Sequence, residues 1–349
     1  MSKISALDGI SARTLIDLRQ VYQSFRDADR LMRRSYKGSM RFVERDHGEY
    51  LVRIVSRSQT GLGRRSPETE KMLADFTAGK VRTKERLAGL TRALNTQAAM
   101  AKAIGLGRVP RTVARVLRAL DDADVLGHLR IVGTNALYAY EASAGVQVMA
   151  DALATGDIDL LLDARRRLRI MVEDENERSI LALLRKADDT FDRVQGRTFT
   201  VANKDGFQVD LIRAQPKAPW IKQPGEDPLR DGDLIPAPIL GLQWLVNVPS
   251  LSAIVVDENG YPAPMLVPDP RNWMVHKAWL ANQANREPVK KRRDRLQAEV
   301  VRDILLNHLT QYPLDEDFLQ KLPRPLRAAA VPLLSVASDD EDEVPQPRW

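Results

Sequence analysis

One short acidic segment constrains this chain more than any other feature. Residues 157–163 read Asp-Ile-Asp-Leu-Leu-Leu-Asp, a pattern that predicts a strand. Because successive side chains of a strand point to opposite faces, Asp157, Asp159 and Asp163 share one face of it. Neighbouring carboxylates repel each other unless a cation lies between them, and hard oxygen ligands suit Mg²⁺. Taken alone, these acids could equally mark a solvent-facing strand end.

The segment before this strand predicts a phosphate-binding turn. Residues 128–132 form a short predicted strand, and Gly133-Thr134-Asn135 joins it to a helix expected over 135–152. Glycine lets a backbone approach a phosphate closely, and a helix N-terminus supplies free N–H groups with a partial positive charge. The Thr134 hydroxyl could donate to the same anion. The alternative is that Thr134 or Asn135 simply caps the helix.

A third carboxylate follows on a later predicted strand. Residues 198–201 and 207–212 predict a hairpin, and Asp210 lies in its second strand between Val209 and Leu211. A carboxylate beside a metal-binding pair can help to lower the pKa of an attacking hydroxyl and to align it, as phosphoryl transfer requires.

These elements, in this order, resemble the nucleotidyltransferase superfamily with its polymerase-beta-like fold. The matching strings are Val132-Gly133-Thr134, Asp157-Ile158-Asp159 and Val209-Asp210-Leu211, within a resemblance that covers about residues 128–310. The wider context looks like an uncharacterised bacterial branch related to abortive-infection toxin transferases. Two departures are Thr134, where Gly or Ser is usual, and the 24-residue step from Gly133 to Asp157, for which a longer first helix would account.

The resemblance implies a metal-dependent enzyme that moves a nucleoside monophosphate from an NTP to a hydroxyl. It implies Mg²⁺, with Mn²⁺ as an alternative, and assigns Asp157, Asp159 and Asp210 as catalytic and metal-binding residues. The nucleotide phosphates would contact Gly133, Thr134, Asn135 and two cationic residues of late helices, Lys277 and Arg293.

The fold expected is α+β: a mixed sheet core flanked by helices, with a mainly helical basic N-terminal region and a helical C-terminal region. We expect a basic region over 1–127 with a β-hairpin near 40–56, a catalytic core over 128–240, and a hairpin with helices over 241–335 that completes the nucleotide site. An acidic, disordered tail is expected over 336–349.

The N-terminal region suggests a polyanionic partner. Residues 1–130 hold 26 Lys and Arg against 14 Asp and Glu, whereas the whole chain carries a net charge of +6. Within this region, residues 61–65 are expected to form a basic loop and residues 66–104 a helix. Residues 98–126 allow two interpretations, a DNA-binding helix-turn-helix or a packing helix, and the second is favoured.

Composition excludes several classes of protein. The chain has no cysteine, its four histidines lack zinc-site spacing, and no apolar run is long enough to cross a membrane, so we expect a cytoplasmic protein. The acceptor could be RNA such as tRNA, a protein side chain or a small molecule, and the basic region favours RNA. The protein could act as a toxin or antiviral effector held by an antitoxin or other partner protein. The alternative is a catalytically inactive nucleotide-sensing or nucleic-acid-binding module of the same fold.

Overall fold

The computed structural model describes residues 3–45, 47–163, 179–216 and 232–339. The chain divides into two compact units. The small unit comprises residues 13–106 and 259–262, and the large unit comprises residues 1–12, 107–258 and 263–349. The expected α+β class is confirmed. In the part of the chain that is described, no helix is both long and apolar enough to cross a membrane.

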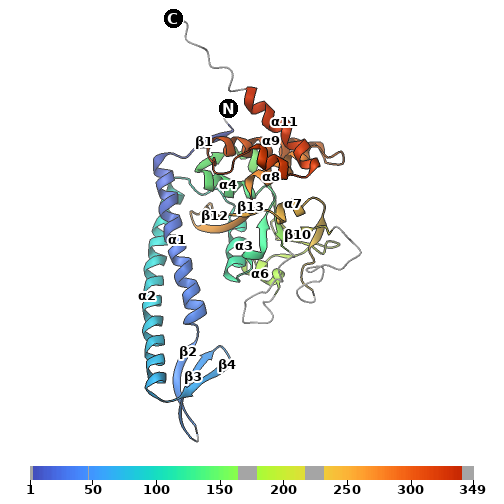
Figure 1. Ribbon diagram of the computed structural model, residues 1–349. Coiled ribbons are helices and arrows are strands. Elements are labelled where there is room, and N and C mark those ends of the chain that lie inside the picture. The colour runs from blue at the N-terminus through green and yellow to red at the C-terminus, as the bar shows by residue number, and fades with distance from the viewer. Residues whose placement is uncertain (1–2, 46, 164–178, 217–231, 340–349) are drawn as a thin grey trace. The chain divides into compact units, whose positions relative to one another are not determined.

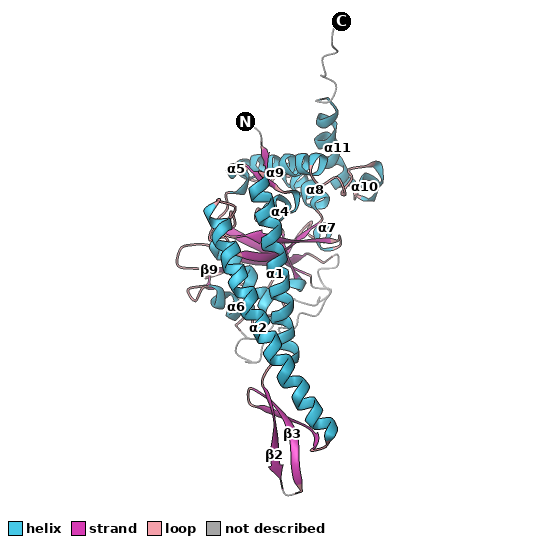
Figure 2. Ribbon diagram, turned by 90° about the vertical axis from the view of Figure 1, so that its left-hand side faces the viewer, coloured by secondary structure: helices cyan, strands magenta, loops and turns pink. Residues whose placement is uncertain are grey.

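The small unit combines two long helices with an antiparallel sheet, and the two helices run alongside each other in both views (Figures 1 and 2). Ser66 caps the second helix, and its side chain and that of Thr69 satisfy each other's backbone amides in a capping box. The elements are α1 (Gly9–Ser35), β2 (Ser39–Arg45), β3 (Gly48–Val55), β4 (Ser58–Arg64) and α2 (Pro67–Ala103).

The predicted hairpin of the small unit is present, but the prediction of a basic loop over 61–65 is wrong. Residues up to Arg64 belong to β4, a third strand that pairs with β3 through a bulge at Leu51 and Val52. Gly61 and Gly63 carry no side chain, so hydrophobic alternation could not reveal this strand. Gly63, at φ +139°, adopts a backbone conformation that favours glycine.

A mixed sheet forms the centre of the large unit. The order β5-β7-β10-β9-β8 places β7 parallel to β10, whereas β5 and β9 run antiparallel to their neighbours; β11 adds to β10 in parallel. The strands are β5 (Leu129–Ile131), β7 (Asp157–Leu162), β8 (Asp192–Arg193), β9 (Thr200–Ala202), β10 (Gln208–Ala214) and β11 (Ala237–Ile239).

Helices and a second hairpin pack around this sheet over a large apolar core, and Leu161, Ile212 and Leu245 belong to a second, smaller apolar cluster. The helix α3 (Arg111–Asp122) buries Val113, Val116, Leu117 and Leu120 and packs on α6, as the packing interpretation of residues 98–126 expects. The other elements are η1 (Leu126–His128), α6 (Ile180–Ala187), α7 (Gln243–Val246), β12 (Ser250–Val256), β13 (Pro262–Pro268), α8 (Pro270–Ala281), α9 (Pro288–Asn307), α10 (Glu316–Lys321) and α11 (Arg324–Asp339).

The long helix expected over 135–152 is wrong. The helix α4 (Ala136–Ala144) ends at Gly145, which adopts the left-handed conformation at φ 67°. The chain then forms β6 (Val146–Val148), which pairs antiparallel with β1 (Ile4–Ala6), and the short helix α5 (Ala150–Leu153). The 24-residue step from Gly133 to Asp157 therefore contains an added strand rather than a longer helix.

The acidic tail expected over 336–349 falls largely outside the described residues. The helix α11 continues to Asp339, and residues 340–349 are not described.

Gly145→Ala tests the helix stop. A left-handed backbone costs an L residue about 1–2 kcal/mol, so we expect a loss of about 1 kcal/mol in the free energy of unfolding. Gly127→Ala is the matched control, because Gly127 has no positive φ and open space around its Cα, and it should be neutral or slightly stabilising. Urea titrations of both variants measure the difference, and equal stabilities would contradict this account of the stop.

Candidate functional site

The three predicted aspartates lie side by side at the start of two parallel strands. In the register of β7 and β10, Asp159 is opposite Asp210 and Asp157 is opposite Gln208. Registered neighbours on adjacent strands share a face, so all three carboxylates lie on one face. Each is partly exposed, whereas Ile158 and Val209 between them are fully buried on the other face.

The turn at Gly133 lies directly against one of these carboxylates. A Cβ atom added at Gly133 would be 1.9 Å from Oδ2 of Asp159, so no larger residue fits there without moving the carboxylate. The backbone N–H of Val132 donates to the carbonyl of Asp159 at 3.3 Å, which ties the turn to β7. The predicted phosphate-binding turn and the predicted acidic pair are therefore one site.

Thr134 and Asn135 are both buried, and neither side chain caps α4. The simple helix-cap interpretation of these residues is therefore wrong. Asn135 instead donates from Nδ2 to the backbone carbonyl of Asp157 at 2.6 Å, and its Oδ1 is buried without a hydrogen-bond partner. Asn135 thus fixes the distance between the turn and the first aspartate.

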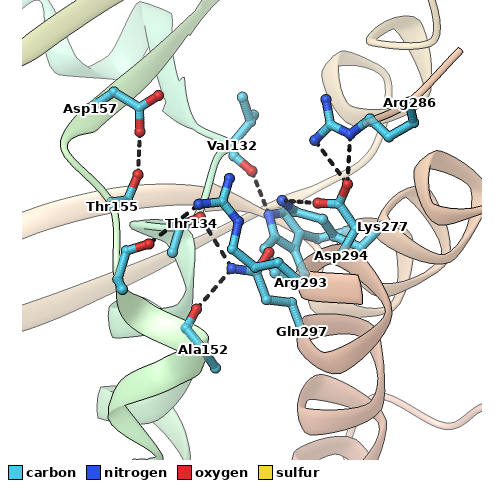
Figure 3. A network of polar contacts seen from close by, with 12 residues as sticks. Val132, Thr134, Ala152, Thr155, Asp157, Lys277, Arg286, Arg293, Asp294 and Gln297 are labelled. Carbon is cyan, nitrogen blue, oxygen red and sulfur yellow. Dashed lines mark hydrogen bonds and ion pairs between the residues drawn. The ribbon is translucent and has the colours of Figure 1, made fainter. Parts of the chain in front are cut away.

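Gln297 on α9 is a site residue that the sequence did not reveal. Its Nε2 donates to the carbonyl of Ala152 at 2.8 Å and to Oγ1 of Thr134 at 3.1 Å (Figure 3). Because a carbonyl can only accept, the first bond fixes which end of the amide faces Thr134. Oγ1 of Thr134 is therefore an acceptor in this contact, and its own proton remains free to donate elsewhere.

A buried ion-pair network lies beside the site. Lys277 donates to Oδ1 of Asp294 at 3.0 Å, and Arg286 approaches Oδ2 of the same carboxylate at 2.8 Å (Figure 3). Asp294 is fully buried and Lys277 is 5% exposed. Burial lowers the pKa of Lys277, against the opposing effect of Asp294. Lys277, expected as a phosphate contact, is thus already held by a carboxylate.

Arg293, the other expected phosphate contact, lies one residue before Asp294 on α9. It donates from one guanidinium nitrogen to the carbonyl of Ala154 at 3.3 Å, next to the β7 strand. Its Nε is buried without a hydrogen-bond partner. No other hydrogen bond of the Arg293 guanidinium is formed with the described residues.

The Asp157 carboxylate raises the proton affinity of Asp159 and Asp210 beside it. Burial and the negative charge of Asp157 raise the pKa of Asp159 to about 6, although the positive charge of Lys277 opposes them. Burial is also the main cause that raises the pKa of Asp210, and Asp157 adds to it. Thr155 donates to the Asp157 carboxylate, whereas Oδ1 of Asp210 is buried with no hydrogen-bond partner.

This donor set fits a divalent cation that is shared with a phosphate ligand. Among the described residues, no group of three or more His, Asp or Glu side chains is arranged to hold a metal by itself. Mg²⁺, however, usually binds through one or two carboxylates and completes its shell with water and phosphate oxygens. The mutual repulsion of the aspartates and the unpartnered oxygen of Asp210 are both features that such a cation would relieve.

The comparison with known protein families agrees with this geometry. A family model described as nucleotidyltransferase matches residues 111–323. The chain belongs to this nucleotidyltransferase family. The matched range contains every predicted site residue, from Gly133 to Arg293, and supports transferase activity. No curated protein and no solved structure matches the chain. The bacterial abortive-infection branch therefore stays a prediction.

Asp159→Asn tests the electrostatics of this transferase site. The folded protein holds the Asp159 proton up to about pH 6, whereas an unfolded aspartate releases it near 3.8, so the stability linked to that proton is lost as the pH rises through about 6. With a chelator present, we expect the free energy of unfolding of the variant to be about 1–2 kcal/mol higher than that of the wild type near neutral pH, after allowance for solvent screening. This difference in the free energy of unfolding should disappear at acidic pH.

The control is Asp205→Asn, which neutralises an exposed aspartate on the turn between β9 and β10. It should follow the wild type at every pH in urea titrations. An Asp159→Asn protein less stable than the wild type throughout would show that the carboxylate is not electrostatically strained.

Proposed function

We propose that this protein transfers a nucleoside monophosphate from an NTP to an acceptor hydroxyl and releases pyrophosphate. The observation that carries the proposal is the contact between Gly133 and the Asp159 carboxylate, with Asp210 in register beside it. A phosphate-binding turn and three carboxylates within one site are what phosphoryl transfer needs, and membership of the nucleotidyltransferase family supports the same chemistry.

Each residue has a distinct role in this proposal. The backbone at Gly133 and the free hydroxyl proton of Thr134 bind the triphosphate, with Asn135 holding the turn in place. Asp157 and Asp159 would hold Mg²⁺, or Mn²⁺ in its place, which when bound neutralises charge on the phosphates and lowers the pKa of the attacking hydroxyl.

Asp210 receives the proton of the acceptor hydroxyl. The acceptor oxygen bonds to the α-phosphorus, the bond from that phosphorus to the bridging oxygen of the β-phosphate breaks, and pyrophosphate leaves. The raised pKa of Asp210 and its unpartnered Oδ1 suit a group that accepts a proton during the reaction.

The cations have separate roles. Arg293 contacts the triphosphate through its available N–H groups. Lys277 acts on the phosphates through its charge and not by direct contact, because its ammonium group already binds Asp294.

RNA, with tRNA as one candidate, is the proposed acceptor. The small unit holds 20 Lys and Arg against 10 Asp and Glu over residues 13–106, which favours a polyanion over a protein side chain. A role as a toxin or antiviral effector is a further proposal about biological context. Growth arrest on expression that disappears with Asp159→Asn would support it, and arrest that persists would count against it.

Loss of the paired aspartates tests the catalytic proposal. We expect Asp157→Asn/Asp159→Asn to lower transfer of labelled nucleotide to RNA at least about a hundredfold, because the metal supplies several kcal/mol of transition-state stabilisation. Asp205→Asn is the matched control and should retain activity. No transfer by the wild type to RNA or to lysate proteins, together with NTP binding that ignores Mg²⁺, would favour an inactive nucleotide sensor instead.

Gln297→Leu tests the orientation of the Thr134 hydroxyl. Without the amide donor, the Thr134 hydroxyl is no longer held as an acceptor on that side, so its proton is no longer directed to the nucleotide. We expect the KM for NTP to rise about five- to tenfold, the equivalent of one hydrogen bond, with a smaller change in kcat. If Gln297 acts only through Thr134, the double variant Thr134→Val/Gln297→Leu should have the same KM for NTP as Thr134→Val alone. Additive increases in KM would show that the two residues act independently.

A further inference from the structure

The sheet of the small unit has two faces of different chemical character. Cross-strand register places Arg41 and Arg45 of β2, Tyr50 of β3 and Arg64 of β4 on one face. The three arginines are exposed and Tyr50 is partly exposed. We call these four residues the arginine face. No acidic residue of the described strands β2, β3 and β4 shares it.

The acidic residues of the same strands lie on the opposite face. Glu44 and Glu49 are registered partners there, and Arg65 pairs with Glu49 at 2.6 Å and with Glu70 of α2 at 2.8 Å. Arg65 also covers the ring of Phe42. The consecutive residues Arg64 and Arg65 therefore differ in role: Arg65 is neutralised within the fold, whereas Arg64 points to the other side.

The cations of the arginine face have no carboxylate partner among the described residues. Arg64 extends across β3, because a Cβ added at Gly48 would be 3.1 Å from its guanidinium nitrogens. The Arg45 guanidinium carbon lies 5.9 Å from the centre of the Tyr50 ring. Val52 on the same face is buried, and Gly61 opposite it leaves room for arginine stems to cover it. Two positive charges, those of Arg45 and Arg64, thus lie next to one aromatic ring.

This arrangement matches what a single nucleic-acid strand requires. Guanidinium groups bind phosphates without regard to sequence, and an aromatic ring offers a stacking surface for a base. From standard strand dimensions the face measures about 13 Å along β2 and about 10 Å across the sheet, enough for a few nucleotides. The arginines lie beside an aromatic ring and not beside carboxylates. This favours a nucleic acid over an acidic protein as the partner, because only a nucleic acid offers bases that can stack on the ring.

We propose that the arginine face binds single-stranded RNA and that this RNA is the acceptor strand. The proposal rests on the proposed function for the choice of RNA, since the reaction needs a strand that offers a hydroxyl. Arg41, Arg45 and Arg64 contact phosphates, and Tyr50 stacks on a base.

The experiment compares two charge-matched variants by fluorescence anisotropy with a labelled single-stranded RNA of about twelve nucleotides. Arg41→Gln/Arg45→Gln/Arg64→Gln removes three charges from the arginine face. Arg82→Gln/Lys84→Gln/Arg86→Gln removes three from exposed positions on α2. At about 0.1 M salt we expect the first to lose at least tenfold in affinity and the second less than threefold. In a plot of log affinity against log salt concentration, the slope of the first variant should be smaller in magnitude than that of the wild type by about two, because three phosphate contacts are lost. The slope of the second variant should not change.

Tyr50→Ala provides a second measurement that leaves every charge in place. It should weaken binding about tenfold, and Tyr50→Phe should restore it, because stacking needs the ring and not the hydroxyl. No RNA binding by the wild type, equal losses in both triple variants, or tighter binding of duplex DNA than of single-stranded RNA would overturn the proposal.

Catalysis and RNA binding are separated by testing Asp159→Asn in the same assay without NTP. If wild type and Asp159→Asn bind RNA equally through the arginine face but neither transfers nucleotide, the binding surface stands and the proposed activity fails. If the wild type transfers nucleotide to RNA and the arginine-face variant does so equally at limiting RNA, the surface is wrong and the activity stands.

Discussion

The parallel pairing of β7 with β10 is the constraint on which the site depends. It sets Asp159 opposite Asp210, and strand alternation then brings Asp157 to the same face. A shift of one residue in that register would turn Asp210 into the apolar core and expose Val209 in its place. The full burial of Ile158, Leu160 and Val209 holds the register, so the apolar core of the large unit determines where the acidic groups lie.

Two features of the chain reduce the repulsion between the carboxylates of the site. Gly133 leaves room for the Asp159 carboxylate, and the positive charge of Lys277 offsets part of the repulsion from Asp157. Lys277 is itself held by Asp294, whose second oxygen is taken by Arg286. The chain therefore stabilises its acidic pair incompletely, as the raised pKa of Asp159 shows, and a divalent cation with a triphosphate would complete the compensation.

Local patterns predicted the elements that hold the site, while long-range contacts supplied the rest. Alternation in residues 157–163 was enough to find β7 and the common face of its aspartates, and glycine at 133 was enough to predict a close approach to the backbone. The break at Gly145 was missed because Val146–Val148 becomes a strand only by pairing with Ile4–Ala6, far away in the sequence. The sequence does not reveal Gln297 for a similar reason, since its partners lie far away along the chain. One signal was available: Asp294 and Gln297 lie on the same buried side of α9 as Val301 and Ile304, and polar residues within a buried apolar row indicate a specific role. The sequence predicts Lys277 as a phosphate contact but does not reveal its ion pair with Asp294, because the two residues are 17 positions apart on different helices.

A crystal structure of the protein with Mn²⁺ and a non-hydrolysable nucleoside triphosphate, with the metal located by its anomalous scattering, tests directly whether Asp157 and Asp159 hold the metal. We expect Mn²⁺ within about 2.2 Å of carboxylate oxygens of both Asp157 and Asp159, with triphosphate oxygens beside Gly133 and the Thr134 hydroxyl. Mn²⁺ and triphosphate bound away from these two aspartates, or triphosphate bound at Gly133 with no metal on the carboxylates at saturating Mn²⁺, would contradict this expectation.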